Sequence, residues 1–118
     1  MLVVDDIAAI ASSYFSAEER GFLLHVPAEK RFDCVLRLWT LKEAAVKAIG
    51  LGLQLPLDSF AFALDPPRLL SAGAEFGDIA LWRFEEKMFA NARIALAVRC
   101  QHPGKLTVIF KKIPLSAL

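Results

Sequence analysis

A long helical segment, predicted over residues 28–49, constrains the fold of this 118-residue chain more than any other feature. Pro27 stands just before its first turn, where a missing N–H is tolerated, and Gly50 is a favourable residue to end it. Side chains placed at steps of about 100° gather into two apolar sides. One stripe contains Phe32, Val35, Leu36, Trp39 and Val46; the other arc contains Cys34, Leu38, Leu41, Ala45 and Ile49. Two apolar sides predict a helix that packs on two sides.

Glu43 interrupts the first apolar stripe of this segment. It falls at about 20° from Phe32 and one turn after Trp39. A carboxylate among apolar side chains is costly unless it is paired or binds a metal. Two interpretations are open: a surface ion pair with Lys47, four residues further on, or a functional site. The remaining polar side of the segment is narrow and consists of Asp33, Arg37, Thr40 and Lys47.

Shorter helices are predicted before the long one. A first helix is predicted over residues 6–14, where Asp5 or Asp6 can act as the cap and the apolar side chains recur at helical spacing. Ser16 and Glu19 form a capping-box pattern, in which each side chain bonds the backbone N–H of the other. This pattern starts a second short helix that ends near Val26.

The second half of the chain reads as strands and turns. Alternating or β-prone stretches between turn residues predict strands over residues 59–64, 79–84, 93–99 and 106–113. Asn91 and the Pro103-Gly104 pair suit antiparallel turns. Helices followed by a strand meander indicate an α+β fold with the long helix packed on an antiparallel sheet. The length predicts a single domain over residues 1–118.

Charge and composition exclude several classes of function. The chain has 14 Lys and Arg against 13 Asp and Glu, so it lacks the basic excess of nucleic-acid binders. Neither a membrane-spanning apolar run nor the basic start of a signal peptide appears, and we expect a cytoplasmic protein. The isolated positions of Cys34, Cys100, His25 and His102 argue against a zinc site. We expect the two thiols to be reduced and buried.

The densest run of reactive side chains is WTLKEAAVKA, residues 39–48. This run resembles the W-[ST]-x-K-E-[AS]-x-x-K signature of the 4′-phosphopantetheinyl transferases, in particular the larger, pseudo-dimeric class that primes polyketide, nonribosomal-peptide and related carrier proteins. YFSAEE, residues 14–19, is similar to the family's F-F-S-x-x-E element. GLGLQLPLDSF, residues 50–60, is similar to its G-x-G-L-x-x-P-L-x-x-F continuation. The three segments occur in the family's order and cover about residues 6–64.

The resemblance implies a reaction and a fold. The family transfers the phosphopantetheine arm of coenzyme A to a serine of an acyl or peptidyl carrier protein and releases 3′,5′-ADP. A magnesium ion bridges the pyrophosphate of coenzyme A and the protein. The corresponding fold is a transferase-like half-domain in which the long helix packs on an antiparallel sheet.

The resemblance also implies roles for four residues. Glu43 matches the metal-binding glutamate, which has also been assigned as the base for the serine proton. Lys42 and Lys47 match lysines that approach the phosphates of coenzyme A, so Glu43 and Lys42 are the candidate catalytic residues. Trp39 matches a packing residue. Magnesium prefers hard oxygen ligands and lysine suits phosphate oxygens, which agrees with these roles. The alternative is that both lysines are solvated and that Trp39 is simply part of the core.

The sequence departs from the family at its N-terminus. The family carries a G-[IV]-D-x-E motif whose two acids complete the magnesium site, and no such motif precedes residue 14 here. Asp5 and Asp6 lie closer to Ser16 than the family's acids do, and Asp6 suits a helix cap. The chain thus resembles the C-terminal half of the larger class. We expect activity to be complete only in an assembly, as a homodimer or with a partner chain; the alternative is a truncated or non-catalytic interaction module.

Overall fold

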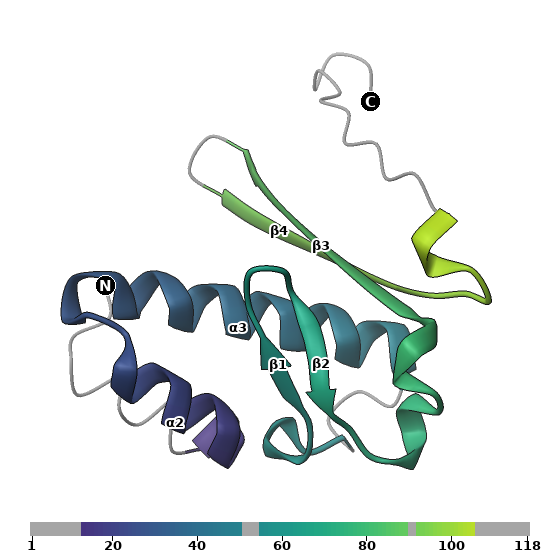
Figure 1. Cartoon of the computed structure of the whole chain (residues 1–118), viewed down its shortest axis with the longest axis horizontal. Helices are drawn as coiled ribbons and strands as arrows, with labels where there is room; N and C mark the ends of the chain where they lie inside the picture. Colours follow the sequence, from purple (N-terminus) through teal and green to yellow (C-terminus); the bar gives the residue numbers. More distant parts are fainter. Residues whose placement is uncertain (1–12, 51–54, 90–91, 106–118) are drawn as a thin grey trace.

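The computed structural model describes residues 13–50, 55–89 and 92–105. Two helices, α2 (Ala17–His25) and α3 (Ala28–Ile49), lie side by side in antiparallel orientation (Figure 1). Both confirm the predicted segments. The helix predicted over residues 6–14 lies outside the described residues except for Ser13 and Tyr14, which are helical.

The helix ends follow from local side-chain chemistry. The Ser16 hydroxyl accepts the N–H of Glu19, and the Glu19 carboxylate accepts the N–H of Ser16, which confirms the capping box. Pro27 is the residue before α3, and Gly50 closes that helix in the left-handed conformation with φ of 82°. The Gly50 N–H reaches the Val46 carbonyl, which is one of the carbonyls that an open helix end leaves without a partner.

Four strands form two antiparallel pairs. The first pair joins β1 (Ala61–Ala63) to β2 (Arg68–Ser71), and the second joins β3 (Trp82–Phe89) to β4 (Ala92–Arg99). The strand predicted over 93–99 is confirmed and begins one residue earlier.

The other strand predictions need correction. Residues 57–59 form a 3-10 turn, so the strand predicted over 59–64 shrinks to β1. Residues 79–81 also form a 3-10 turn, and β3 begins only at Trp82. The short strand β2 was not predicted. The strand predicted over 106–113 lies outside the described residues.

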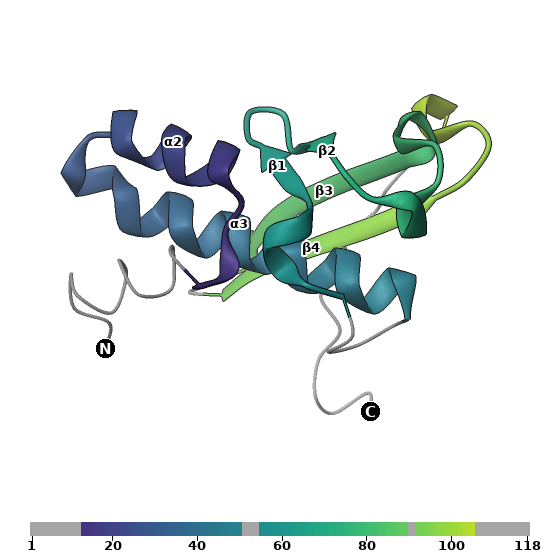
Figure 2. The same ribbon diagram turned by 90° about the horizontal axis from the view of Figure 1, so that it is seen from below.

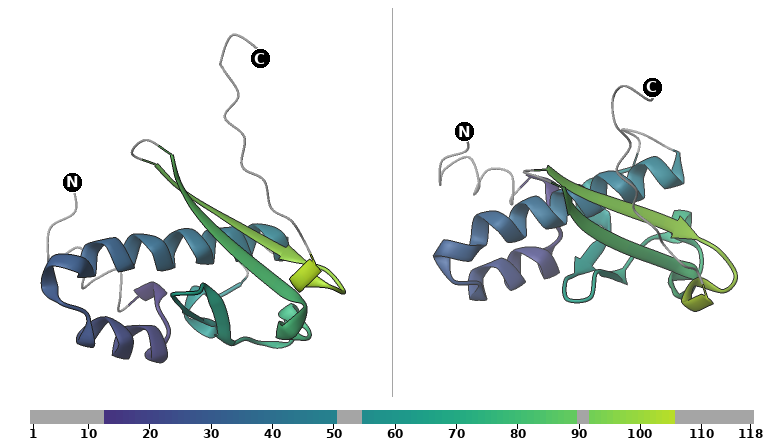
Figure 3. Two further views of the ribbon diagram at one scale, coloured as in Figure 1. Left: turned by 45° about the horizontal axis from the view of Figure 1, so that its top comes forward. Right: turned by 90° about the horizontal axis from the view of Figure 1, so that it is seen from above.

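The long β3–β4 hairpin crosses α3 obliquely, and β4 is the strand in closest contact with the helix (Figures 1 and 3). Seen from below, the short β1–β2 hairpin lies beside α2 and α3 (Figure 2). The small side chains of Ala95 and Ala97 allow β4 to approach the core that α3 builds. This arrangement is the α+β fold expected from the sequence, with the helices packed on small antiparallel sheets.

The core is rich in aromatic side chains. Phe60, Phe62, Phe84, Trp82 and Phe76 form a closed cycle of ring contacts, with centroids 4.7 to 6.1 Å apart. Aromatic pairs at these separations add stability beyond the area they bury. The cycle belongs to the same core cluster as the buried side of α3, and its members come from both hairpins and the segments that adjoin them. It therefore joins the two sheets to one core.

Two expectations from composition can be compared with the structure. Cys34 and Cys100 are not bonded to each other, and each is half-buried instead of fully buried. Within the described ranges, no helix has both the length and the apolar character needed to cross a bilayer.

Candidate functional site

The surroundings of α3 differ around its circumference. The fully buried side consists of Val35, Leu38, Leu41, Lys42 and Ala45. The stripe around Glu43 is only half-buried at Leu36, Trp39 and Val46, and Phe32 is 41% exposed. The helix therefore packs on both apolar sides, but one side is fully buried and the other only partly.

Glu43 lies on the half-buried side of α3. Its carboxylate has no hydrogen bond or ion pair with any residue that the structure describes, and it forms no ion pair with Lys47. The surface-pair interpretation of Glu43 thus has no support in the geometry. Lys47, one turn further on, is exposed. The two side chains place a carboxylate and an ammonium one turn apart on the same helix.

Lys42 lies inside the protein. Its ammonium is 2.8 Å from the Glu19 carboxylate and donates to the carbonyls of Leu57 at 2.5 Å and Phe60 at 2.6 Å. The same nitrogen lies 4.1 Å from the centre of the Phe60 ring, a cation–π contact. These contacts hold the ammonium in the core, whereas the resemblance predicts it at the phosphates of coenzyme A.

Sequence reasoning recognised Glu19 as part of a helix cap and of the family's F-F-S-x-x-E element, without assigning it a contact with Lys42. Its Oε1 accepts the Ser16 N–H and faces the Lys42 ammonium, while Oε2 accepts the N–H of Phe62 at 2.8 Å. One carboxylate thus serves the helix cap, the ion pair and the first sheet. The capping-box pattern accounts for the bond of Glu19 to the Ser16 N–H. Nothing in the sequence indicates that the same carboxylate pairs with Lys42.

Burial and pairing act in opposite directions on Lys42. Desolvation lowers the pKa of the Lys42 ammonium, and the negative charge of Glu19 opposes that effect. Desolvation is the larger of the two, so the pKa lies below the ordinary value for lysine. Within the described part of the chain, every buried side-chain polar atom, the Lys42 ammonium included, has a hydrogen-bond partner.

Trp39 packs as expected from the resemblance. Its ring meets the Tyr14 ring edge-on, with centroids 5.1 Å apart, and it borders the core cluster. Tyr14 belongs to the segment before α2, so the contact fixes that segment against the half-buried side of α3. The packing interpretation and the family role of Trp39 coincide.

The polar side of α3 faces the sheets. The Arg37 guanidinium donates two hydrogen bonds to Glu86 of β3, at 2.8 and 3.0 Å, and a third at 2.9 Å to Asp65 between β1 and β2. Asp33 pairs with Arg93 of β4. Two residues of the narrow polar side therefore attach α3 to both hairpins.

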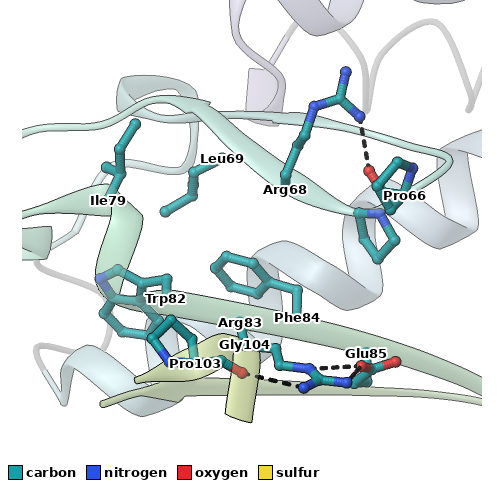
Figure 4. A pocket seen from close by; sticks show the side chains of 11 residues that line it. Pro66, Arg68, Leu69, Ile79, Trp82, Arg83, Phe84, Glu85, Pro103 and Gly104 are labelled. Atoms are coloured by element: carbon teal, nitrogen blue, oxygen red, sulfur yellow. Dashed lines mark hydrogen bonds and ion pairs between the residues drawn. The ribbon is translucent and has the colours of Figure 1, made fainter. Parts of the chain in front are cut away.

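A separate open cavity of about 380 Å³ lies between the two hairpins (Figure 4). Trp82 and Phe84 form its floor, Leu69 and Ile79 line one side, and the Arg83 guanidinium at its edge bonds Glu85 and the Pro103 carbonyl. Neither Glu43 nor either predicted lysine lines this cavity. This cavity is therefore separate from the candidate site on α3.

The metal-binding capacity of the described residues is limited. Across residues 13–50, 55–89 and 92–105, no three His, Cys, Asp or Glu side chains gather closely enough to hold a metal ion. Glu43 offers one hard oxygen donor, which fits magnesium only if substrate phosphates, water or further acids supply the remaining ligands. Asp5 and Asp6 lie outside the described residues.

Comparison with known proteins identifies relatives of this region. The family model of the 4′-phosphopantetheinyl transferase superfamily matches residues 3–98. The 4′-phosphopantetheinyl transferase psf-1 of Bacillus pumilus is 43% identical over 56 residues, which are 48% of this chain and 24% of that protein. The 4′-phosphopantetheinyl transferase Sfp of Bacillus subtilis (strain 168) is 42% identical over 55 residues, 47% of this chain and 25% of that protein. The matches therefore cover about a quarter of the length of these curated relatives. No solved structure gives a significant match.

Proposed function

The chain belongs to the 4′-phosphopantetheinyl transferase superfamily, and from that membership we propose that it takes part in transferring the phosphopantetheine arm of coenzyme A to a serine of an acyl or peptidyl carrier protein. The matched curated relatives are themselves called 4′-phosphopantetheinyl transferases, which supports this reaction.

The observation that carries the proposal is the environment of the Glu43 carboxylate. This carboxylate lies within the matched region, among half-buried apolar side chains, and has no partner among the described residues. An unpaired carboxylate in such surroundings is unfavourable for folding alone. A functional role, as ligand of a hard cation and acceptor of a proton, explains why it is there.

The proposed reaction is a phosphoryl transfer. The serine oxygen bonds to the phosphorus next to the pantetheine, and the bond from that phosphorus to the bridging pyrophosphate oxygen breaks. 3′,5′-ADP leaves with the bond electrons, and the serine proton passes to Glu43. Bound magnesium supplies electrostatic stabilisation of the phosphoryl oxygens in such reactions. Glu43 is the residue of the described chain that would hold it.

Lys47 is the lysine best placed to meet phosphate. Its ammonium is exposed and sits one turn after Glu43, and a flexible point charge suits phosphate oxygens. The predicted contact of Lys42 with the phosphates requires its buried hydrogen bonds and ion pair to break. The proposal therefore relies on Glu43 and Lys47 for direct contact with coenzyme A.

We further propose that an assembly completes the site. A homodimer, or a complex with another chain, can supply the oxygen ligands that the described residues lack. The same shortage supports a second candidate, a non-catalytic interaction module that keeps the fold of the family.

A transfer assay separates the two candidates. The purified chain is incubated with coenzyme A, Mg²⁺ and an apo carrier protein, and the carrier protein is followed by intact mass spectrometry. A transferase adds the phosphopantetheine mass to the carrier, and Glu43→Gln abolishes that addition. An unmodified carrier at every chain concentration, in the presence of folded protein, would favour the interaction module.

A further inference from the structure

The buried Glu19–Lys42 ion pair is the most unusual polar feature of the described chain. The two side chains are 0 and 1% exposed, and their charged atoms are 2.8 Å apart. Removing two charges from water is costly, and a buried ion pair is often no more stabilising than apolar residues of similar volume. Stability alone therefore does not account for the pair.

The contacts of the pair reach four segments of the chain. Glu19 bonds the N-cap of α2 and the N–H of Phe62 in β1, whereas Lys42 projects from α3 and bonds the carbonyls of Leu57 and Phe60. These are directional hydrogen bonds to backbone groups, so they fix the rotation of α3 about its own axis. Apolar packing, which is non-directional, fixes such a rotation less strictly.

Glu43 is the next residue along α3 and lies about 100° further around the helix axis. Its own carboxylate is held by no described side chain or backbone group, so the orientation of its Cα–Cβ bond depends on the helix that carries it. Lys42 anchors that helix at the adjacent position. Any rotation of α3 that moves Glu43 must break the buried contacts of Lys42.

We infer that Glu19 and Lys42 are positioning residues for Glu43, setting the direction in which its carboxylate meets a divalent cation and the pyrophosphate of coenzyme A. The inference rests on the proposed function and reassigns Lys42 from phosphate contact to support. Residues that orient a metal ligand commonly change metal affinity by about 10- to 100-fold when they are replaced.

The test compares stability with metal binding. Mn²⁺ serves as the probe for Mg²⁺, and its dissociation constant in the presence of coenzyme A is measured by electron paramagnetic resonance. The test variant is the double substitution E19Q/K42M, which removes both charges and so leaves neither ion unpaired. The matched control is Arg37→Met, which breaks a different ion-pair cluster on the same helix. Thermal unfolding of each variant is recorded alongside.

We expect E19Q/K42M to fold and to bind Mn²⁺ at least about 10-fold more weakly than the unmodified chain. Arg37→Met should lower the unfolding temperature and leave the Mn²⁺ dissociation constant within about twofold, because its contacts do not adjoin Glu43. Wild-type affinity in folded E19Q/K42M would overturn the inference. So would an equal loss of affinity in both variants, because that would reflect general destabilisation.

Two further outcomes have defined meanings. If the unmodified chain binds no Mn²⁺ in the presence of coenzyme A, both the proposed function and the positioning role are contradicted. If E19Q/K42M binds Mn²⁺ with the affinity of the unmodified chain, only the positioning role is contradicted. If E19Q/K42M does not fold, Glu19→Asp replaces it, since it keeps the charge but shortens the side chain by one methylene. Folded Glu19→Asp with unchanged Mn²⁺ affinity would then contradict the inference.

Discussion

Three charged side chains within six residues of α3 have unlike surroundings. Lys42 is fully buried, Glu43 is half-buried and Lys47 is exposed. The sequence could identify this run as reactive, but it could not predict how exposed each of the three side chains is. The ion-pair partner of Lys42 is Glu19, 23 residues earlier in the chain, and its other contacts are with Leu57 and Phe60. Such distant partners cannot be recognised from the sequence. Tertiary contacts place Lys42 on the fully buried side of α3.

Lys42→Met should be strongly destabilising. The substitution leaves the buried Glu19 carboxylate without its counter-charge, and removing one partner of a buried ion pair costs about 3–5 kcal/mol. Lys47→Met is the matched control, because its ammonium is exposed, and should change the free energy of unfolding by no more than about 0.5 kcal/mol. Urea unfolding measures both. Equal, small effects would show that the Lys42 ammonium is not buried in solution.

Asp65 gives the chain a defined sensitivity to acid. Its hydrogen bonds with Arg37 hold the pKa of the Asp65 carboxyl below the ordinary value near 3.8. The folded state therefore favours the ionised carboxylate. The stabilisation that this carboxylate gives the folded state is fully present above the pKa of Asp65 in the unfolded chain, and it is lost as the pH falls through the lower pKa of the folded state. The carboxylate is 78% exposed, so salt screens the effect.

Asp65→Asn isolates this contribution. Asparagine also tolerates the positive φ of 59° at this position. The difference in free energy of unfolding between the two proteins should be largest near about pH 6 and should shrink towards about pH 3. Urea unfolding over that range measures it, and a difference independent of pH would contradict the assigned role of the Asp65 charge.

At the scale of elements, helices were more predictable than strands. The bounds of α2 and α3 follow from a capping box, a proline and a glycine, which are local signals. The start of β3 was misplaced, and its charged residues Glu85, Glu86 and Lys87 concealed its length. Glu86 is accommodated by Arg37, 49 residues earlier in the chain. Such a partner can be recognised only once the fold is known.

Ser16→Ala tests the capping box at the start of α2. The change removes the hydroxyl that accepts the N–H of Glu19 and should cost about 1 kcal/mol in free energy of unfolding. Ser71→Ala is the control, since that hydroxyl bonds Glu18 of the same helix at an exposed site, and its cost should stay within about 0.5 kcal/mol. Chemical unfolding compares them, and a cost for Ser71→Ala as large as for Ser16→Ala would argue against a special role for the cap.

At the scale of the whole molecule, one core holds the described elements together, yet apolar side chains remain on the surface. Leu24 is 79% exposed, Met88 52% and Leu70 50%. Such side chains mark an association site only where they form a contiguous apolar patch. The sequence led us to expect an assembly but could not locate its surface, because exposure depends on how α2 and the two hairpins pack.

The chain should self-associate in solution. Sedimentation velocity from low to high micromolar concentration should show the weight-average sedimentation coefficient rising from the monomer towards the dimer value. A monomer at every concentration would contradict the homodimer and leave a different chain as the partner that completes the site.

The measurement that tests the central claim most directly is isothermal titration of the chain with coenzyme A, with and without Mg²⁺, and Glu43→Gln as the control variant. The account predicts binding that requires Mg²⁺ and that Glu43→Gln loses, because the Glu43 carboxylate, which has no partner among the described residues, supplies the protein's ligand to the ion. Absence of binding in both conditions, or equal binding by Glu43→Gln, would contradict a metal and coenzyme A site at Glu43.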